Sequence, residues 1–356
     1  MPSSRDRPDE DRSRRSATGA ARIQMADIAR MAGVSTATVS RALSGSPLIQ
    51  AATRDRIRSL ARSLNYQVNA GAASLRRREM STVGVVILED LERPMQAASD
   101  PFVMALVGSL ADALAESGQD MLLARYRAGR RDQLPSLVDS GRVSGLIVMG
   151  QWSWHDALND LARRGVPMAV WGAAPPGTLY PVVGSDNERG GYLATRHLLQ
   201  QGCQRMGFLG DVQHPEVAMR HAGFLRALKE AGQPEACIWQ HPIAFEAPDT
   251  RSIVERWAAA GDWPDGVFVC SDLAALTLMR ALADHGRDVP RQIKVVGYDD
   301  IPLAAHTQPS LTTVSQPFAE AGRALVHTLR ERLEGRFQGP VLLPTELRLR
   351  ESSAAA

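Results

Sequence analysis

The chain has 356 residues, of which 44% are hydrophobic and 22% charged, so it can bury full cores in one small and one large domain or in three compact lobes. It contains no apolar run of transmembrane length and no secretory signal pattern. A spanning or exported protein is therefore not expected, and the cytoplasm is the default location. Its three cysteines show no CxxC or Cys/His spacing, which argues against a disulfide framework or a structural zinc site. No metal and no cofactor are expected.

The modest net charge hides an asymmetry along the chain. Residues 1–78 carry 15 arginines and 6 acidic residues, whereas the remainder carries 26 basic and 33 acidic residues. Part of the basic charge lies in residues 1–22, which are rich in Arg, Ser, Asp and Pro and are expected to form a disordered tail. A basic N-terminal fifth on an acidic body is typical of a nucleic-acid-binding head on a sensor domain.

Residues 25–43 predict two short helices joined by a tight turn. Gly33 supplies the left-handed conformation that ends the first helix, and the Ser35 hydroxyl can cap the second. Small Ala29 and apolar Val39 fall where a helix-turn-helix needs a close helix crossing and a plug on the second helix. The sequence therefore predicts a DNA-binding head.

We expect this helix-turn-helix domain to cover residues 23–68, with a third helix from about Ala52 to Leu64 closing its core. In such a head the N-terminal end of the second helix enters the major groove. Arg41 is the first candidate for a base contact, with phosphate anchoring as the alternative. The expected DNA contacts in the head are Met25, Ser35, Thr36, Ala37, Thr38, Ser40 and Arg41.

The motifs Asp27–Arg41, Leu64–Tyr66 and Asn69–Leu75 resemble the lactose-repressor/galactose-repressor (LacI/GalR) family of bacterial transcription regulators, and the similarity continues to Arg350. The resemblance implies that residues 69–80 form a hinge helix on operator DNA.

In that family a leucine from each hinge wedges into the minor groove of a palindromic site. The resemblance places Leu75 at this position, with Ala72 and Asn69 as further DNA contacts. Val68 stands where the family usually has proline, so the free hinge is expected to be less preorganised.

From Ser81 onward, short apolar runs alternate with amphipathic helical patterns. The runs cover residues 83–88, 121–124, 145–149, 168–171, 206–209, 267–270 and 293–298, and the helical patterns cover residues 102–116, 189–200, 217–231 and 273–284. Continuous apolar strands separated by helices indicate parallel sheets covered on both faces. The expected fold is an all-α helix-turn-helix head followed by an α/β body of two doubly wound parallel-sheet lobes.

The resemblance implies that the body has the type I periplasmic-binding-protein architecture, with an effector between the lobes. The expected effector-binding domain covers residues 81–350: the first lobe about 81–184 and 315–341, the second about 185–312 and 342–350, and then a tail over 351–356.

Three polar residues, Arg220, Asp272 and Asp299, match the family's effector positions. Arg220 can fork onto vicinal hydroxyls or a carboxylate, and Asp299 can accept two hydroxyl hydrogen bonds. Ser271 stands where the family often has asparagine, and Asp272 follows it. Asp272 has an alternative role as the N-cap of the helix expected over residues 273–284.

Aromatic residues gather near the expected strand ends of the first lobe. Phe102, Trp152 and Trp171 are candidate effector contacts, because aromatic rings stack on the apolar faces of sugars. Trp154 belongs to the same group, and core packing is the alternative for each ring.

These features predict a sequence-specific transcriptional regulator, acting as a repressor, whose operator affinity is controlled by a small effector, a sugar. We expect a homodimer on a palindromic double-stranded operator. A corepressor-type regulator responding to a non-sugar metabolite is the alternative. The sequence has no GxSxG elbow, P-loop or HExxH motif, so an enzyme is not expected, and a sugar-binding receptor should carry an export signal.

Overall fold

The computed structural model describes residues 25–43, 46, 48–64, 82–89, 99–127, 134–233, 238–243, 248–336 and 339–354. The chain divides into two compact units, Met1–Glu79 and Met80–Ala356, here called the head and the body. The expected tail over residues 1–22 and hinge over 69–80 lie outside the described residues.

The described part of the head contains three helices, α1 (Met25–Ala32), α2 (Thr36–Leu43) and α3 (Ala51–Ser63). Their inward faces form one small apolar core that includes Ile28, Val39 and Ile57, each with no exposed surface. With so few buried side chains, the head depends on its turn and caps as well as on burial.

The turn between α1 and α2 has the chemistry expected from the sequence. Gly33 adopts φ +65°, and the amide of Val34 donates to the Ala29 carbonyl at 3.0 Å, which satisfies a carbonyl at the end of α1. The Ser35 hydroxyl accepts a hydrogen bond from the Thr38 amide at 3.1 Å and so caps α2.

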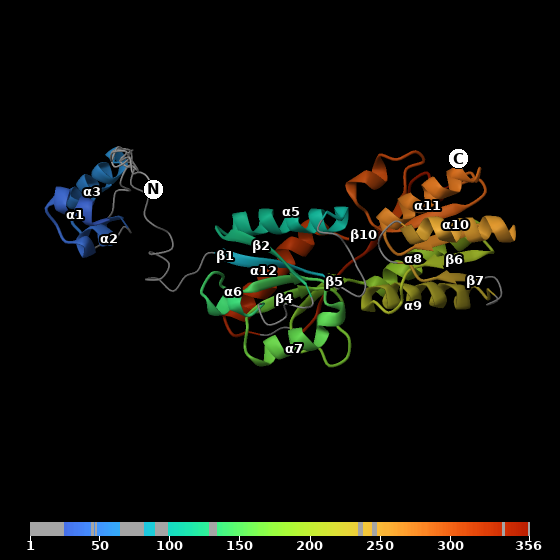
Figure 1. The fold of residues 1–356 in the computed structure, drawn as a ribbon, viewed down its shortest axis with the longest axis horizontal. Coiled ribbons are helices and arrows are strands. Elements are labelled where there is room, and N and C mark those ends of the chain that lie inside the picture. The colour runs from blue at the N-terminus through green and yellow to red at the C-terminus, as the bar shows by residue number, and fades with distance from the viewer. Residues whose placement is uncertain are drawn as a thin grey trace, which may run out of the picture. The chain divides into compact units, whose positions relative to one another are not determined.

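The body consists of two lobes, each built on a six-stranded sheet covered by helices on both faces (Figure 1). The first sheet has the order β11-β5-β4-β3-β1-β2 and the second the order β12-β10-β9-β8-β6-β7. The strands of the first sheet are β1 (Thr82–Glu89), β2 (Asp120–Arg127), β3 (Leu146–Met149), β4 (Met168–Trp171), β5 (Val182–Ser185) and β11 (Val341–Leu343). Those of the second are β6 (Met206–Leu209), β7 (Ile238–His241), β8 (Gly266–Val269), β9 (Lys294–Asp299), β10 (Thr312–Ser315) and β12 (Glu346–Arg348).

The helices of the body divide between the two lobes. The first lobe holds α5 (Pro101–Glu116), α6 (Ser136–Asp139), the 3-10 turn η2 (Trp152–Trp154), α7 (His155–Arg163) and α12 (Phe318–Leu333). The second holds α8 (Asn187–Gln200), α9 (Pro215–Glu230), α10 (Pro248–Ala260), α11 (Asp272–Asp284) and the 3-10 turn η4 (Pro302–Ala305). Together they give the two doubly wound lobes that the sequence predicted.

Apolar residues explain why the strands pair in this way. In β1, Val85 and Ile87 face one buried cluster, and Val86 and Leu88 face another. A strand that is apolar on both faces fits only a sheet with helices on both sides. Among the strand pairs of the described residues, all are parallel except that of β10 with β12, so β12 runs antiparallel at the edge of the second sheet.

Three chain crossings join the lobes. They follow β5, β10 and β11, and the last differs from expectation: β11 pairs with β5 through Leu343, so the chain stays with the first sheet slightly beyond Val341. The crossings are bonded to one another, since the Asp186 amide donates to the Leu343 carbonyl at 3.0 Å and the Thr345 hydroxyl to the Asp186 carbonyl at 3.3 Å.

The C-terminal segment was predicted only as a tail. Its described part, through residue 354, packs on the second lobe, where the Ser352 amide donates to the Ser310 carbonyl at 2.8 Å. The Ser353 hydroxyl lies 2.8 Å from His197 Nε2, and both residues are buried. The Ser352 hydroxyl also donates to the Val295 carbonyl of β9, and the Ser353 hydroxyl to the Thr312 hydroxyl of β10, so residues 352 and 353 are fixed against the second sheet.

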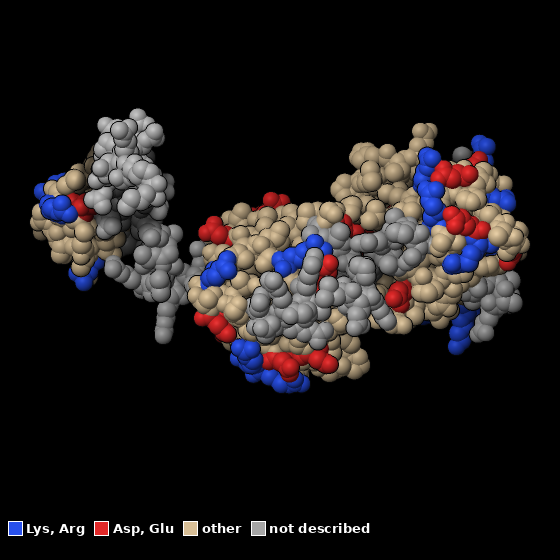
Figure 2. Space-filling view, viewed as in Figure 1, with Lys and Arg blue, Asp and Glu red and all other residues tan. Residues whose placement is uncertain are grey.

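The surface of the body is polar and mixed in charge. On the face drawn in Figure 2, acidic and basic side chains are interspersed over both lobes, as on an ordinary solvated surface. In the ranges described above, none of the helices combines the length and the apolar character needed to span a bilayer.

Candidate functional site

The first candidate site is the surface of the head around the start of α2. Ser35, Thr36, Ala37 and Arg41 are exposed, whereas Thr38 and Ser40 are half-buried. The buried residues of this helix, Val39 and Ala42, lie on its other face. The helix can therefore present its N-terminal end to a groove without losing core contacts.

The remaining candidates of the head are placed differently. Met25 is half-buried and packs against the apolar core, so its side chain also has a structural role. Asn69, Ala72 and Leu75 lie outside the described residues, and their expected DNA contacts remain predictions.

The second candidate site lies at the boundary between the lobes, at the carboxyl ends of the strands. Arg220 projects from α9 and is only 5% exposed. Its Nε donates to Asn187 Oδ1 at 2.8 Å, its Nη1 donates to the Cys270 carbonyl, and its guanidinium carbon lies 3.6 Å from the centre of the Tyr298 ring. These contacts fix the guanidinium plane before any ligand arrives.

Asp299 ends β9 and is 4% exposed. Its φ of +126° is unusual for a residue with a side chain, and such conformations cluster at functional sites. Burial raises the pKa of Asp299 to about 7, against the opposing charge of Arg220. The carboxyl group can therefore change its proton occupancy when a ligand binds.

The structure gives Asp272 and Ser271 structural roles. The Asp272 carboxylate accepts from the Ile301 amide at 2.9 Å and from the Thr313 hydroxyl, so both of its oxygens have protein partners. The proposed capping role of Asp272 was wrong by one residue, because the Ser271 hydroxyl accepts from the Ala274 amide and caps α11. We therefore favour Arg220 and Asp299 over these two as effector contacts.

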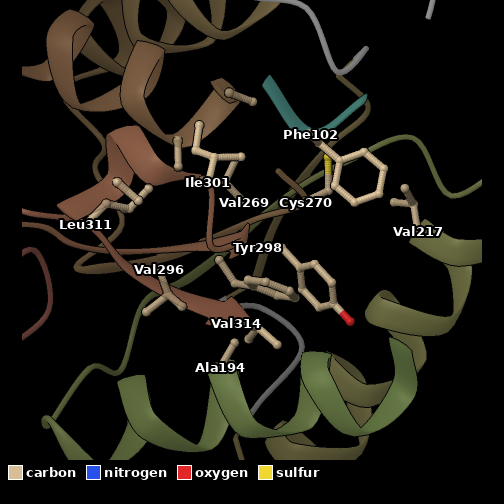
Figure 3. Packing of buried hydrophobic residues seen from close by; sticks show 14 of the residues in the cluster. Phe102, Ala194, Val217, Val269, Cys270, Val296, Tyr298, Ile301, Leu311 and Val314 are labelled. Atoms are coloured by element: carbon tan, nitrogen blue, oxygen red, sulfur yellow. The ribbon is translucent and has the colours of Figure 1, made fainter. Parts of the chain in front are cut away.

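Aromatic rings line the first-lobe side of the boundary. The Phe102 ring centre lies 6.2 Å from that of Trp171 and 5.6 Å from that of Phe318. Phe102 belongs to the same buried cluster as Tyr298 and Val217 of the second lobe (Figure 3). The apolar packing is thus continuous from one lobe to the other.

The other two tryptophans of the predicted group are Trp154 and Trp152. Trp154 has no exposed surface and donates from its indole nitrogen to the Glu89 carbonyl at 3.3 Å, which is the core role given as its alternative. Trp152 lies in η2, but its side chain is outside the described part of the structure, so its expected effector contact remains a prediction.

A hydrogen-bond chain connects Asp299 to the lobe crossings. Gln316 donates from Nε2 to Asp299 Oδ1 at 2.7 Å, and Ser185 donates from its hydroxyl to Gln316 Oε1 at 2.8 Å. Ser185 and Gln316 stand at two of the three crossings. These two residues, as well as Asn187 and Tyr298, were not predicted as site residues, although all four lie within or beside segments that the sequence patterns marked.

The comparisons with known proteins agree with this division of the chain. The family model described as "Bacterial regulatory proteins, lacI family" matches residues 24–69, and that described as "Periplasmic binding protein-like domain" matches residues 195–353. The transcriptional repressor PurR of Photobacterium profundum is 30% identical over 313 residues, which cover 86% of this chain and 91% of that protein.

Solved structures show the same architecture. The complex of the transcriptional regulator CelR with cellobiose has a TM-score of 0.67 at 28% identity and covers 93% of this chain and 100% of that one. The lac repressor dimer bound to operator and the anti-inducer ONPF has a TM-score of 0.80 at 24% identity, covering 94% of this chain and 99% of that one, and it supports the fold alone.

Proposed function

The chain belongs to the lacI family of bacterial regulatory proteins, and from this premise we propose that a sugar bound between its two lobes controls its affinity for operator DNA. It is a DNA-binding transcriptional regulator and not an enzyme. Within that class we assign it the role of a repressor that works in the cytoplasm, where the DNA of a bacterium lies.

The observation that carries this proposal is the arrangement around Arg220 and Asp299. A fixed guanidinium and a carboxyl group can donate to and accept from neighbouring hydroxyl groups. The rings of Phe102 and Trp171, on the other side of the boundary, supply an apolar surface for the face of a sugar. The CelR structure holds cellobiose, which supports a carbohydrate as the class of ligand.

The same arrangement supports a route from the ligand to the lobes. A ligand that hydrogen-bonds to Asp299 competes with, or strengthens, the bond from Gln316. Gln316 is bonded to Ser185 at another crossing, so the change reaches two segments about which the lobes turn. A ligand with different affinity for the open and closed lobes then shifts the population between them.

The shift between open and closed lobes changes the relative positions of the two heads of a dimer. We propose a two-fold symmetric homodimer that places one head on each half of a palindromic operator. In each head, the start of α2 contacts bases and phosphates, and the hinge over residues 69–80 orders on DNA with Leu75 as its wedge. Movement of the lobes would change the spacing of the hinges and so the affinity for the operator.

Fluorescence anisotropy tests this function directly. Full-length protein is titrated onto a labelled fragment of its own promoter region, with and without mono- and disaccharides, at a fixed salt concentration because phosphate contacts make the affinity salt-dependent. We expect specific binding that a sugar weakens and that Asp299→Ala makes insensitive to the sugar. No binding to any part of the promoter region would refute the proposal, and a sugar that strengthens binding would indicate the corepressor mode.

A further inference from the structure

Two polar side chains at the lobe boundary carry buried atoms that have no hydrogen-bond partner among the described residues. Gln151 follows β3 and is 1% exposed, and neither its Nε2 nor its Oε1 has a hydrogen-bond partner among the described residues. The buried Oε2 of Glu216, in the first turn of α9, likewise has none in the described part of the chain. Buried polar groups are normally paired, so this pair calls for a physical explanation.

The two side chains converge from opposite lobes on one glycine. Gly172 follows β4, and a Cβ atom there would overlap Gln151 Oε1 and lie 3.0 Å from Glu216 Oε1. Gln151 and Gly172 come from the first lobe, and Glu216 comes from the second. The absence of a side chain at Gly172 therefore leaves room for the Gln151 amide and the Glu216 carboxyl group over its backbone.

The groups around this point make it a site for hydrogen-bond donors. Both converging oxygens are acceptors, and Glu216 Oε2 adds a third. Arg220 is the cation whose charge acts on Glu216, but its Nε and Nη1 are already bonded to Asn187 and Cys270.

Tyr180 is a further titratable residue that interacts with Glu216. The Tyr180 hydroxyl, whose pKa is raised by burial and by the charge of Glu216, lies 2.8 Å from His155 Nδ1. Burial also raises the pKa of Glu216 itself. An anionic ligand group would meet the amide oxygen of Gln151 and the carboxyl group of Glu216 here, whereas a hydroxyl or ammonium group would satisfy them.

We propose that Gln151 and Glu216 form a donor-selective end of the effector site, which binds a hydroxyl or ammonium group of an uncharged or cationic polyhydroxy compound and rejects its phosphorylated or carboxylated forms. A hydroxyl group both donates and accepts, so it can donate to Glu216 while it accepts from the Gln151 amide. This inference rests on the proposed function, because it concerns the effector of the same site. It adds the chemistry that discriminates between effectors at that end.

The position of the pair also gives it a part in closure. A single ligand group bonded to Gln151 and Glu216 would connect the first lobe to the second. Bonds that exist only when the lobes are closed favour the closed state by the difference in affinity.

The test uses full-length protein and matched probes: D-glucose, D-glucosamine and glucose 6-phosphate; D-ribose and ribose 5-phosphate; and cellobiose. The thermal shift of each probe is converted into an apparent affinity. The variants are Gln151→Met and Glu216→Gln, and Gln200→Met and Glu255→Gln serve as controls, because both of these residues are exposed on helices of the second lobe.

We expect a neutral or amino probe to bind wild type at least tenfold more tightly than its phosphorylated counterpart. Glu216→Gln should reduce this ratio at least tenfold, and Gln151→Met should weaken the neutral probe by a similar factor. Without ligand, both variants should melt no lower than the controls, because Gln151→Met removes an unpaired buried amide and Glu216→Gln keeps the side-chain shape while it replaces a carboxyl group whose charged form burial disfavours.

Three results would overturn the inference. These are equal binding of the phosphorylated probes by wild type, unchanged selectivity in both variants, or unliganded melting temperatures several degrees below those of the controls, which would mark a purely structural role. Asp299→Asn separates this inference from the proposed function. If it abolishes the response to every probe while Glu216→Gln leaves selectivity intact, the effector site stands and the donor-selective end falls. If no probe shifts wild type, both fall.

Discussion

The head and the body place their functional side chains in opposite ways. In the head, most of the candidates around α2 (Ser35, Thr36, Ala37 and Arg41) are exposed, and the core is made by other residues on the far faces of the helices. In the body, Arg220, Asp272 and Asp299 are buried, and the side chain of each is hydrogen-bonded to another residue of the protein. Function and stability should therefore separate in the head and coincide in the body.

This difference follows from the two kinds of ligand. DNA is a large polyanion that is met at a surface, and much of the affinity comes from exposed cations. A small ligand is held in a dry site where polar groups must be fixed in advance by other polar groups. Substitutions that remove one group at a time test this difference between the head and the body.

The largest effect is expected in the body for Asp272→Ala. The substitution leaves the Ile301 amide and the Thr313 hydroxyl without their acceptor, and each such loss costs about 1–3 kcal/mol. We expect the free energy of unfolding to fall by about 3 kcal/mol, measured by urea denaturation with tryptophan fluorescence. Asp272→Asn keeps one carbonyl acceptor and should lose less. Equal stability of Asp272→Ala and wild type would contradict the structural role.

Asp299 should link stability to pH. Its pKa is raised to about 7 by burial, so between its unfolded value near pH 4 and about pH 7 the folded protein holds a proton that the unfolded chain has released. Stability is therefore greatest below the unfolded pKa and falls as the pH rises through the folded pKa. Thermal unfolding of the wild type from pH 5 to pH 8 should show this decline.

Asp299→Asn provides the control for that pH dependence, because its amide does not titrate. The variant should reduce the decline, and the slope that remains belongs to the other buried groups with shifted pKa values, among them Asp272 and Glu216, whose pKa burial also raises. A variant with the full slope of the wild type would show that another group is responsible.

The contrast between head and body also explains what sequence patterns could predict. The head is specified locally: Gly33, Ser35 and the apolar positions around them lie within one short segment, and the structure has the turn, the cap and the core that they predict. The two doubly wound lobes were predicted as well, because β1, β3 and β8 are continuous apolar runs.

Elements whose sequence pattern is weaker were missed. The strand β7, with the sequence Ile-Trp-Gln-His, lies at a sheet edge and has no apolar run. The helix α12 was also not predicted, although its residues show amphipathic spacing. It follows strand β10 of the second lobe in the sequence but packs on α5 of the first lobe.

The effector site shows the same limit. Arg220 and Asp299 were found through motifs, but the partners of Asp272 lie 29 and 41 residues away in the sequence. No local pattern distinguishes such a carboxylate from one that is open to a ligand. Gln151 and Glu216 were missed for the same reason, since only the fold brings them to Gly172.

In the head, Arg41→Ala should change function without changing the body. A bidentate contact with a base contributes about 1–3 kcal/mol of discrimination, so we expect specific operator affinity to fall about 5- to 150-fold. The thermal shift produced by effector should stay at its wild-type value. Anisotropy at several salt concentrations distinguishes the two roles of Arg41, because loss of a phosphate contact weakens all sequences alike and lowers the salt slope by about one.

Arg56 offers a matched control for Arg41 within the same unit. Its Nη2 donates to the Ala32 carbonyl at the end of α1, so Arg56→Ala should weaken the head by about 1 kcal/mol and lower its affinity for all DNA sequences together. If Arg41→Ala behaved in the same way as Arg56→Ala, the separation of function from stability in the head would not hold.

The smallest effect is expected for Ser35→Ala, which removes the cap of α2. A lost N-cap costs about 1 kcal/mol, because the Thr38 amide loses its acceptor. The cost falls on the head alone, so the melting transition of the body should not move, while the hydrogen exchange of α2 amides becomes faster. Ser35→Asp restores an acceptor at the same place and should recover the protection. The operator affinity of Ser35→Asp should nevertheless be lower than that of the wild type, because the added carboxylate would face phosphate. If Ser35→Asp recovered both protection and affinity, Ser35 would act only as a cap and not as a DNA contact.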